Sequence, residues 1–298
     1  MIMKKNALIA LFAFAIAGFS LTSCSDSDDA PATQDPIENP NPNPNPNPNP
    51  NPNPTAKFQH KVLLEDITGT WCPACPIASD AIKQAKQNAA NGDKVVAAAI
   101  HIGQSSYPDP MEFQRGYNLY TSVFVPKYGS GGSFSFPTVA INRGAKWNQQ
   151  GIAPFFNAIN QQGSDVGIKI NSELTQTGGN ITATFKFNEG YQNLKYNVYV
   201  IEQGVVVTDS PQLGSNEGAN YVHYDVLRAI SGTISGNDLG NVTAGQEIVK
   251  SGQNVQYTLF NNDLSKVEVV VFVTDATGKV LNVQKAPANT GIDYEMLD

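Results

Sequence analysis

Two cysteines separated by two residues, Cys72 and Cys75, are the residues of this chain best suited to chemistry. Their setting is Trp71-Cys72-Pro73-Ala74-Cys75-Pro76, and the only other cysteine among the 298 residues is Cys24. Two thiols at this spacing beside a β–α pattern can form a reversible disulfide and exchange it with other thiols. The same pair could instead be a static disulfide, which an oxidising compartment favours.

A metal site is a much weaker interpretation of the same cysteines. The three histidines, His60, His101 and His223, are scattered and lack the paired spacing of zinc ligands. His101 is expected at a strand end as a packed or rim residue. Because the chain also lacks a phosphate-binding loop and a G-x-S-x-G motif, we expect neither a metal nor another cofactor.

Three elements are expected to position the two cysteines. Residues 61–67 form a short apolar run typical of a buried strand, and residues 95–102 form another. Between them, apolar residues recur at helical spacing from Pro73 to about residue 91. A strand, a helix and a second strand make a βαβ unit, in which the cysteines follow the carboxyl end of the first strand, where open α/β sheets place their sites.

The start of this helix predicts different roles for the two thiols. We expect Cys72 at the N-cap, Pro73 at the first helical position, and Cys75 one turn further in. The unpaired N–H groups and the positive dipole end of a helix lower the pKa of a thiol there. Cys72 is therefore predicted to be the attacking thiolate, and Cys75 to resolve the mixed disulfide.

A second motif, Phe136-Pro137-Thr138, precedes another strand-like run. A proline in this position marks a turn into a strand and is compatible with a cis peptide bond. Residues 104–134 before the strand are expected to hold a helix over 110–123. A closing helix is expected over 147–162, since apolar residues recur there at helical spacing.

The pattern changes to period two after residue 163. About seven short strands separated by turn signals are expected over residues 164–298, which is typical of an immunoglobulin-like β-sandwich. Its longest loops are predicted over 209–220 and 232–246. His223 and Arg228 are expected in one strand region, where packing is a better-supported role than binding.

The N-terminal 24 residues are expected to be a signal peptide. Lys4 and Lys5 precede a short apolar run, and Leu21-Thr22-Ser23-Cys24 follows it. That sequence resembles the lipobox of bacterial lipoproteins, in which the cysteine is acylated and becomes the new N-terminus. Cys24 is thus predicted to be a lipid anchor, the alternative being an ordinary signal peptide with an incidental cysteine.

Residues 25–56 are predicted to be a stalk. The acidic run over 25–29 resembles the surface-export signal of Bacteroidetes lipoproteins, although it could equally be a solvated linker. Eight Asn-Pro pairs fill residues 39–54, and such a chain is extended, so it reaches roughly 50 Å. The net charge of −7 without a basic cluster argues against nucleic acid as a partner.

Residues 57–163 resemble the thioredoxin superfamily through Trp71 before the first cysteine and the aromatic-Pro-Thr loop. The resemblance implies that Pro137 is the family's cis-proline and that Trp71, Phe136 and Thr138 contact substrate. It also implies that Asp66 is a buried acid that moves the proton of Cys75; an exposed acid at the strand end is the alternative. Residues 104–134 make the cysteine–proline interval longer than in a minimal thioredoxin, and Pro73-Ala74 lacks the histidine of strongly oxidising relatives.

The whole layout resembles the Bacteroidetes outer-membrane lipoprotein family often called Omp-twenty-eight-related. It includes the lipobox, the linker, Thr-Gly-Thr-Trp-Cys-x-x-Cys-Pro and His-x-x-Val-Leu-Arg. The resemblance implies attachment to the outer membrane and thiol–disulfide exchange with thiols or disulfides of exported proteins. The alternative is a surface-displayed adhesin or ligand-binding module whose disulfide is structural.

Overall fold

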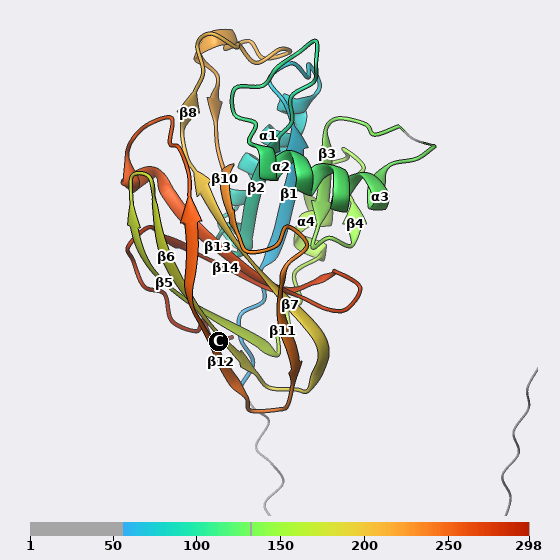
Figure 1. Ribbon diagram of the computed structural model, residues 1–298. Helices are drawn as coiled ribbons and strands as arrows, with labels where there is room; N and C mark the ends of the chain where they lie inside the picture. The colour runs from blue at the N-terminus through green and yellow to red at the C-terminus, as the bar shows by residue number, and fades with distance from the viewer. Residues whose placement is uncertain (1–55, 132, 298) are drawn as a thin grey trace, which may run out of the picture. The chain divides into compact units, whose positions relative to one another are not determined.

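The computed structural model describes residues 56–131 and 133–297 (Figure 1). The predictions for the signal peptide, Cys24, the acidic run and the Asn-Pro stalk concern residues outside these ranges. They remain predictions.

The first part of the chain forms the predicted βαβ unit. Strands β1 (Val62–Thr68) and β2 (Val95–His101) pair in parallel, with α1 (Cys75–Lys86) between them in the chain. On its other side β1 pairs antiparallel with β3 (Thr138–Ile141), and β3 pairs with β4 (Ala145–Lys146). The apolar runs therefore located both buried strands to within a residue.

The other helices differ from their predicted bounds. In the inserted segment, α2 (Gln114–Leu119) continues through the π-helical turn η2 (Tyr120–Phe124) into α3 (Val125–Tyr128), so helix begins later and ends later than expected. The predicted closing helix is only α4 (Ala153–Asn157). It starts late for two reasons. Trp147 is still extended, because its N–H bonds the Val139 carbonyl at 2.9 Å. In addition, the helix begins where a proline falls in its first turn, a position that favours proline.

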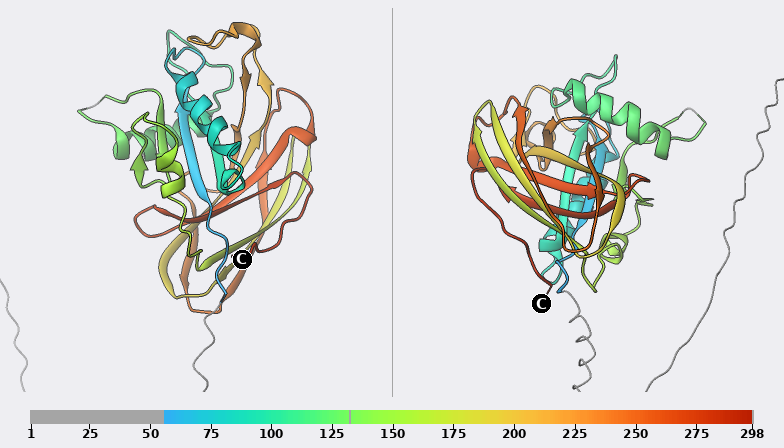
Figure 2. Two further views of the ribbon diagram at one scale, coloured as in Figure 1. Left: turned by 180° about the vertical axis from the view of Figure 1, so that it is seen from behind. Right: turned by 60° about the horizontal axis from the view of Figure 1, so that its bottom comes forward.

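The two faces of this part of the sheet carry different helices. Val62 and Leu64 of β1 pack in the cluster under α1 and α4, whereas Leu63 and Ile67 pack in the cluster that includes α2. Figure 1 shows α2 and α3 in front of the sheet, and Figure 2 shows α1 on the opposite side. Asp66 shares its face of β1 with Val62 and Leu64, which is the α1 side.

The rest of the chain is largely β-sheet. Its strands are β5 (Val166–Thr175), β6 (Gly178–Phe187), β7 (Tyr191–Glu202), β8 (Val205–Val206), β9 (Val222–His223), β10 (Val226–Ser231), β11 (Asn237–Val242), β12 (Glu247–Gln256), β13 (Val267–Thr274) and β14 (Val280–Pro287). A three-stranded sheet in the order β12-β6-β5 packs face to face against the strands around β7 and β13. Alternate apolar residues of both sheets form this core, as period two requires.

One sheet joins the two parts of the chain. Its order is β14-β13-β7-β10-β2-β1-β3-β4, with β11 also paired to β7. The junction is the parallel pairing of β10 with β2, where Val226 lies opposite Ala99 and the Ala99 N–H bonds the Asp225 carbonyl at 2.7 Å. The protein is thus a mixed α/β start followed by a β-sheet body. The boundary at residue 163 and the thioredoxin-like and immunoglobulin-like assignments remain predictions.

Two details of the β-rich body were wrong in the sequence prediction. The predicted loop 232–246 contains β11, an irregular strand whose register against β7 shifts twice and whose polar residues hide any alternation. His223 and Arg228 lie in different strands, because Asp225 has a φ of 58° and breaks the run. A positive φ at a residue with a side chain is not readable from a hydrophobic pattern.

A buried ionic cluster connects the two parts of the chain. Arg143 donates to Glu65 through Nε at 2.8 Å and through Nη2 at 2.9 Å. The Tyr199 hydroxyl donates to Glu65 at 3.0 Å and accepts from Arg143 at 2.6 Å. Because these groups come from β1, the turn after β3, and β7, the cluster fixes the relative position of three distant segments.

Candidate functional site

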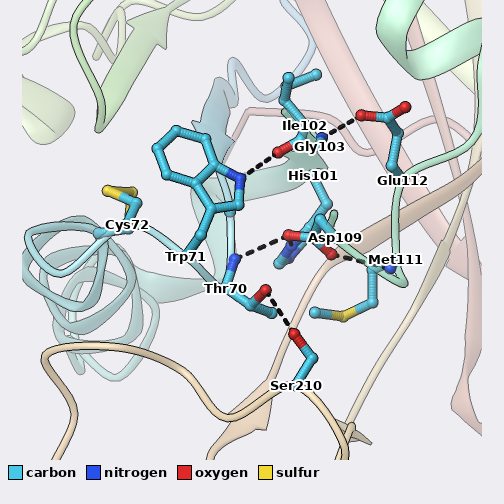
Figure 3. A network of polar contacts seen from close by, with 12 residues as sticks. Thr70, Trp71, Cys72, His101, Ile102, Gly103, Asp109, Met111, Glu112 and Ser210 are labelled. Carbon is cyan, nitrogen blue, oxygen red and sulfur yellow. Dashed lines mark hydrogen bonds and ion pairs between the residues drawn. A yellow bond between two sulfur atoms is a disulfide. The ribbon is translucent and has the colours of Figure 1, made fainter. Parts of the chain in front are cut away.

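The cysteines form a disulfide just beyond the carboxyl end of β1 (Figure 3). The S–S distance is 2.10 Å and the Cα–Cα distance is 5.4 Å. The turn that carries them is held by the Cys72 N–H bonding the Gly69 carbonyl at 3.0 Å and the Cys75 N–H bonding the Cys72 carbonyl at 3.2 Å. Cys72 is only 3% exposed and Cys75 1%, so access to either sulfur is restricted.

The helix does not begin where the sequence predicted. Its N-cap is Ala74 and its first residue is Cys75. The predicted N-cap position of Cys72 is therefore wrong, as are the predicted positions of Pro73 in the first helical position and of Cys75 one turn further in. Pro76 falls in the first helical turn, where the missing N–H of proline costs nothing. Cys75 is therefore the sulfur closest in sequence to the unpaired N–H groups of the helix.

Aromatic side chains lie beside the disulfide turn. The Trp71 indole Nε1–H donates to the Ile102 carbonyl at 2.6 Å (Figure 3), and its ring lies 5.0 Å from that of Phe136 in an edge-to-face arrangement. The Phe136–Pro137 peptide bond is cis, and the Thr138 hydroxyl bonds the Ser135 carbonyl at 2.6 Å. The structure thus brings two separate sequence motifs, 71–75 and 136–138, together around Trp71 and Phe136.

Asp66 is buried rather than exposed, so the alternative of an exposed strand-end acid is wrong. It is 2% exposed, and within the described part of the chain its Oδ1 has no hydrogen-bond partner. Burial, followed by the nearby Asp225 carboxylate, raises the pKa of Asp66 to about 8. The side chain lines a cavity of about 380 Å³ between α1, β2 and residues 217–225, so it is neutral at pH 7 yet adjacent to open space.

Asp225 and its partners were not found by sequence reasoning. Lys86 of α1 donates to both carboxylate oxygens of Asp225, at 2.7 and 2.8 Å, and Gln203 donates to one of them at 2.9 Å. Asp225 lines the same cavity as Asp66. Because Lys86 and Asp225 are 139 residues apart in the chain, no local pattern pairs them.

A second buried acid, Asp109, holds the turn before the cysteines. One oxygen accepts from the Thr70 N–H at 2.8 Å and lies 2.9 Å from Nδ1 of His101, and the other accepts from the Met111 N–H at 2.9 Å (Figure 3). Burial alone would raise the pKa of Asp109, but the contact with His101 and the two backbone bonds outweigh it and lower the pKa. His101 is thus a packed positioning residue, as its strand-end location indicated.

Residues 210–214, which we name the strap, cross over the disulfide turn from the β-rich body. Ser210 and Thr70 share a hydrogen bond between their hydroxyls at 3.0 Å, and the Leu213 N–H bonds the Thr70 carbonyl at 2.8 Å. The buried Gln212 amide donates to the Cys72 carbonyl at 3.0 Å. The sequence predicted a long loop here, but nothing in its composition indicated what the loop contacts.

Replacing Gly214 by Ala should loosen the strap. Gly214 has a φ of 77°, and a Cβ there would lie 1.9 Å from the Pro73 carbonyl oxygen, so we expect a loss of roughly 2 kcal/mol of stability. We also expect faster reduction of the disulfide by dithiothreitol, followed by thiol alkylation. Gly204→Ala is the matched control, because Gly204 has a φ of 70° with nothing within 4 Å. Equal reduction rates in the two variants would contradict a shielding role for the strap.

Comparison with known proteins defines the class of this chain as an outer-membrane protein. The family model for outer membrane protein Omp28 matches residues 124–291, more than half of the sequence. The chain belongs to this family, and the predicted location at the outer membrane is confirmed. The match begins after the cysteine pair, so it carries no information on Cys72 and Cys75.

A solved structure shows the same fold. HBP35 of Porphyromonas gingivalis is 18% identical, with a TM-score of 0.64 over 79% of this chain and 77% of that one. A comparison with curated proteins found no match. Within residues 56–131 and 133–297, no helix combines the length and the hydropathy needed to cross a membrane.

Proposed function

We propose that this protein is a lipid-anchored thiol–disulfide oxidoreductase or isomerase of the cell envelope that acts on exported proteins. The observation that carries the proposal is the Cys72–Cys75 disulfide at the carboxyl end of β1, beside Trp71 and the cis Phe136–Pro137 bond. Residues 57–163 would be a thioredoxin-like domain and residues 164–298 an immunoglobulin-like one. Cys24 would be the anchor and residues 25–56 the stalk.

The oxidising reaction would proceed through a mixed disulfide. A substrate thiolate attacks Sγ of Cys72, the Cys72–Cys75 bond breaks, and Cys75 leaves as a thiolate that takes up a proton. A second substrate thiolate then attacks the substrate sulfur and releases the Cys72 thiolate. Two electrons have passed from the substrate to the pair, and the reverse sequence reduces a substrate disulfide. In isomerisation, the Cys72 thiolate of the reduced pair attacks a substrate disulfide and displaces one substrate thiolate. Another substrate thiolate then attacks the substrate sulfur bound to Cys72 and releases the Cys72 thiolate, so no net electrons are transferred.

Asp66 would supply and recover the proton of Cys75. With a pKa of about 8, Asp66 differs little from an ordinary thiol, whose pKa is about 8.5. Proton transfer between two groups of matched pKa requires little free energy in either direction. Trp71, Phe136 and Thr138, with Pro137 between the last two, would contact the substrate next to the reacting sulfur.

A second candidate function has its own supporting observation. Both cysteines are almost fully buried, and the strap bonds the turn that carries them. This favours a surface-displayed adhesin or ligand-binding module in which the disulfide is structural. The two candidates differ in whether Cys72 exchanges with other thiols.

Replacing Cys75 by Ser should trap substrates on Cys72. Without a resolving thiol, the mixed disulfide persists, so full-length protein in its own cell envelope should show adducts on non-reducing gels that vanish with reductant. Cys72→Ser is the matched control and should form none.

The reduction potential of the Cys72–Cys75 disulfide gives a second criterion. Exchange catalysts have potentials between about −270 and −120 mV, whereas structural disulfides have potentials below about −300 mV. No adduct together with such a low potential would favour the structural disulfide.

A further inference from the structure

A hollow of about 620 Å³ lies along the outer side of Phe136. It is bounded by the chain that follows β2 and by the start of the inserted helices. We name it the aromatic groove and define it by Ile102, Glu112, Tyr117, Tyr120 and Phe136. The strap contacts the Gly69–Pro73 turn from another segment, so the groove is a separate surface beside the disulfide turn.

A series of aromatic rings connects the groove to the disulfide turn. The ring of Trp71 is 5.0 Å from that of Phe136, Phe136 is 5.8 Å from Tyr120, and Tyr120 is 6.1 Å from Tyr117. Tyr117 is 39% exposed, and the other three are half-buried. Partly exposed aromatic rings in one continuous row offer edges and faces against which a partner side chain can pack.

The charge of the groove is one-sided. Its lining includes Asp109 and Glu112, and no lysine, arginine or histidine belongs to it among the described residues. The Asp109 side chain is fully buried against His101, whereas Glu112 uses one carboxylate oxygen to accept from the Gly103 N–H. Aromatic faces beside a carboxylate complement a cationic side chain, and best a flat guanidinium.

We propose that the aromatic groove binds an extended segment of an exported polypeptide that carries an arginine near the cysteine reacting at Cys72. The inference rests on the proposed function and adds the substrate class. Three centroid-to-centroid distances of 5.0, 5.8 and 6.1 Å lead from Trp71 to Tyr117. A fully extended chain advances about 3.4 Å per residue, so an arginine about four or five residues from the cysteine reaches the far part of the groove.

Binding of peptides that cannot react tests this without turnover. The oxidised full-length protein is titrated with three unstructured peptides. In each peptide serine replaces the reacting cysteine, and the fourth residue after that serine is Arg, Leu or Glu. The fluorescence of Trp71, one of two tryptophans, and calorimetry report binding. We expect the Arg peptide to bind about fivefold or more tightly than the Glu peptide, with a preference that shrinks at high salt.

Two variants locate the binding site. Tyr120→Ala should weaken binding of the Arg peptide about fivefold, and Glu112→Gln should reduce its advantage over the Leu peptide. Tyr224→Ala is the control, because Tyr224 is 47% exposed but lines the cavity beside Asp66 instead. Binding with no preference for Arg, or equal effects of the two tyrosine variants, would overturn the inference.

The outcomes separate the groove from the chemistry. Adducts in the Cys75→Ser protein without peptide preference would retain the proposed function and overturn the inference. Arg-selective binding without adducts would retain the groove as a binding site and reject thiol exchange. Absence of binding by all three peptides would also overturn the inference.

Discussion

Replacing Asp66 by Asn should change how stability depends on pH. The free energy of unfolding of Asp66→Asn, relative to that of the parent, should rise by about 4 kcal/mol between pH 5 and pH 8. The reason is that burial and Asp225 raise the pKa of Asp66 from 3.8 to about 8 in the folded protein. Asparagine cannot titrate, so the variant lacks this dependence.

The sign follows from proton binding in the two states. At a pH below the pKa of Asp66 in the unfolded state, Asp66 is protonated in both the folded and the unfolded protein. Its contribution to stability is then fully present. Between 3.8 and about 8 the native carboxyl keeps its proton while the unfolded one loses it. The native state therefore binds more protons, and stability falls as pH rises until the native carboxyl also ionises. Any pH-independent cost of burying the Asn amide shifts the curve without changing its slope.

The measurement is chemical denaturation of the oxidised protein over this pH range. Two buried histidines, His60 and His223, have their pKa values lowered to about 4 and about 3. As the pH falls below the pKa of histidine in the unfolded state, these two histidines lower the stability of the protein. Because both are present in the variant and in the parent, their effect cancels when the two free energies of unfolding are subtracted. Asp80→Asn, an exposed acid lining the same cavity, is the control. If the free energy of unfolding depended on pH in the same way in Asp66→Asn and in the parent protein, Asp66 would not be a protonated buried acid.

Replacing Glu65 by Gln should cost about 3–5 kcal/mol of stability, because it leaves the buried Arg143 guanidinium without its counter-charge. Glu65 is 0% exposed and Arg143 3%. Burial alone would lower the pKa of Arg143, but in the parent protein Glu65 and Tyr199 outweigh it and raise the pKa. Without Glu65 the guanidinium still keeps its proton, because arginine is not deprotonated in proteins, so the variant contains a buried and unpaired charge.

A double variant separates the charge from the contact. Adding Arg143→Met to Glu65→Gln removes the unpaired charge at similar volume, so most of the lost stability should return. Asp293→Asn breaks an ion pair with Lys169 in which Asp293 is 75% exposed, and it should leave the denaturation midpoint almost unchanged. A double variant no more stable than Glu65→Gln would show that the loss has another cause.

The sequence by itself determined the parts of this protein that depend on neighbouring residues. The apolar runs located β1 and β2, and the spacing of Cys72 and Cys75 predicted a disulfide between them. The order Phe136-Pro137 was compatible with the cis bond that the structure contains. These features follow from local preferences, because an apolar run, a short loop closure and a proline each act within a few residues.

Only the tertiary structure decided how these parts are surrounded. The sequence left open whether Asp66 is exposed or buried, and in the folded protein α1 and Asp225 enclose it. The strap and the aromatic groove bring residues 210–214 and Tyr120 beside the disulfide turn from distant parts of the chain. Such contacts depend on which surfaces exclude water together, and period-two or helical patterns record only that a face is apolar, not what covers it.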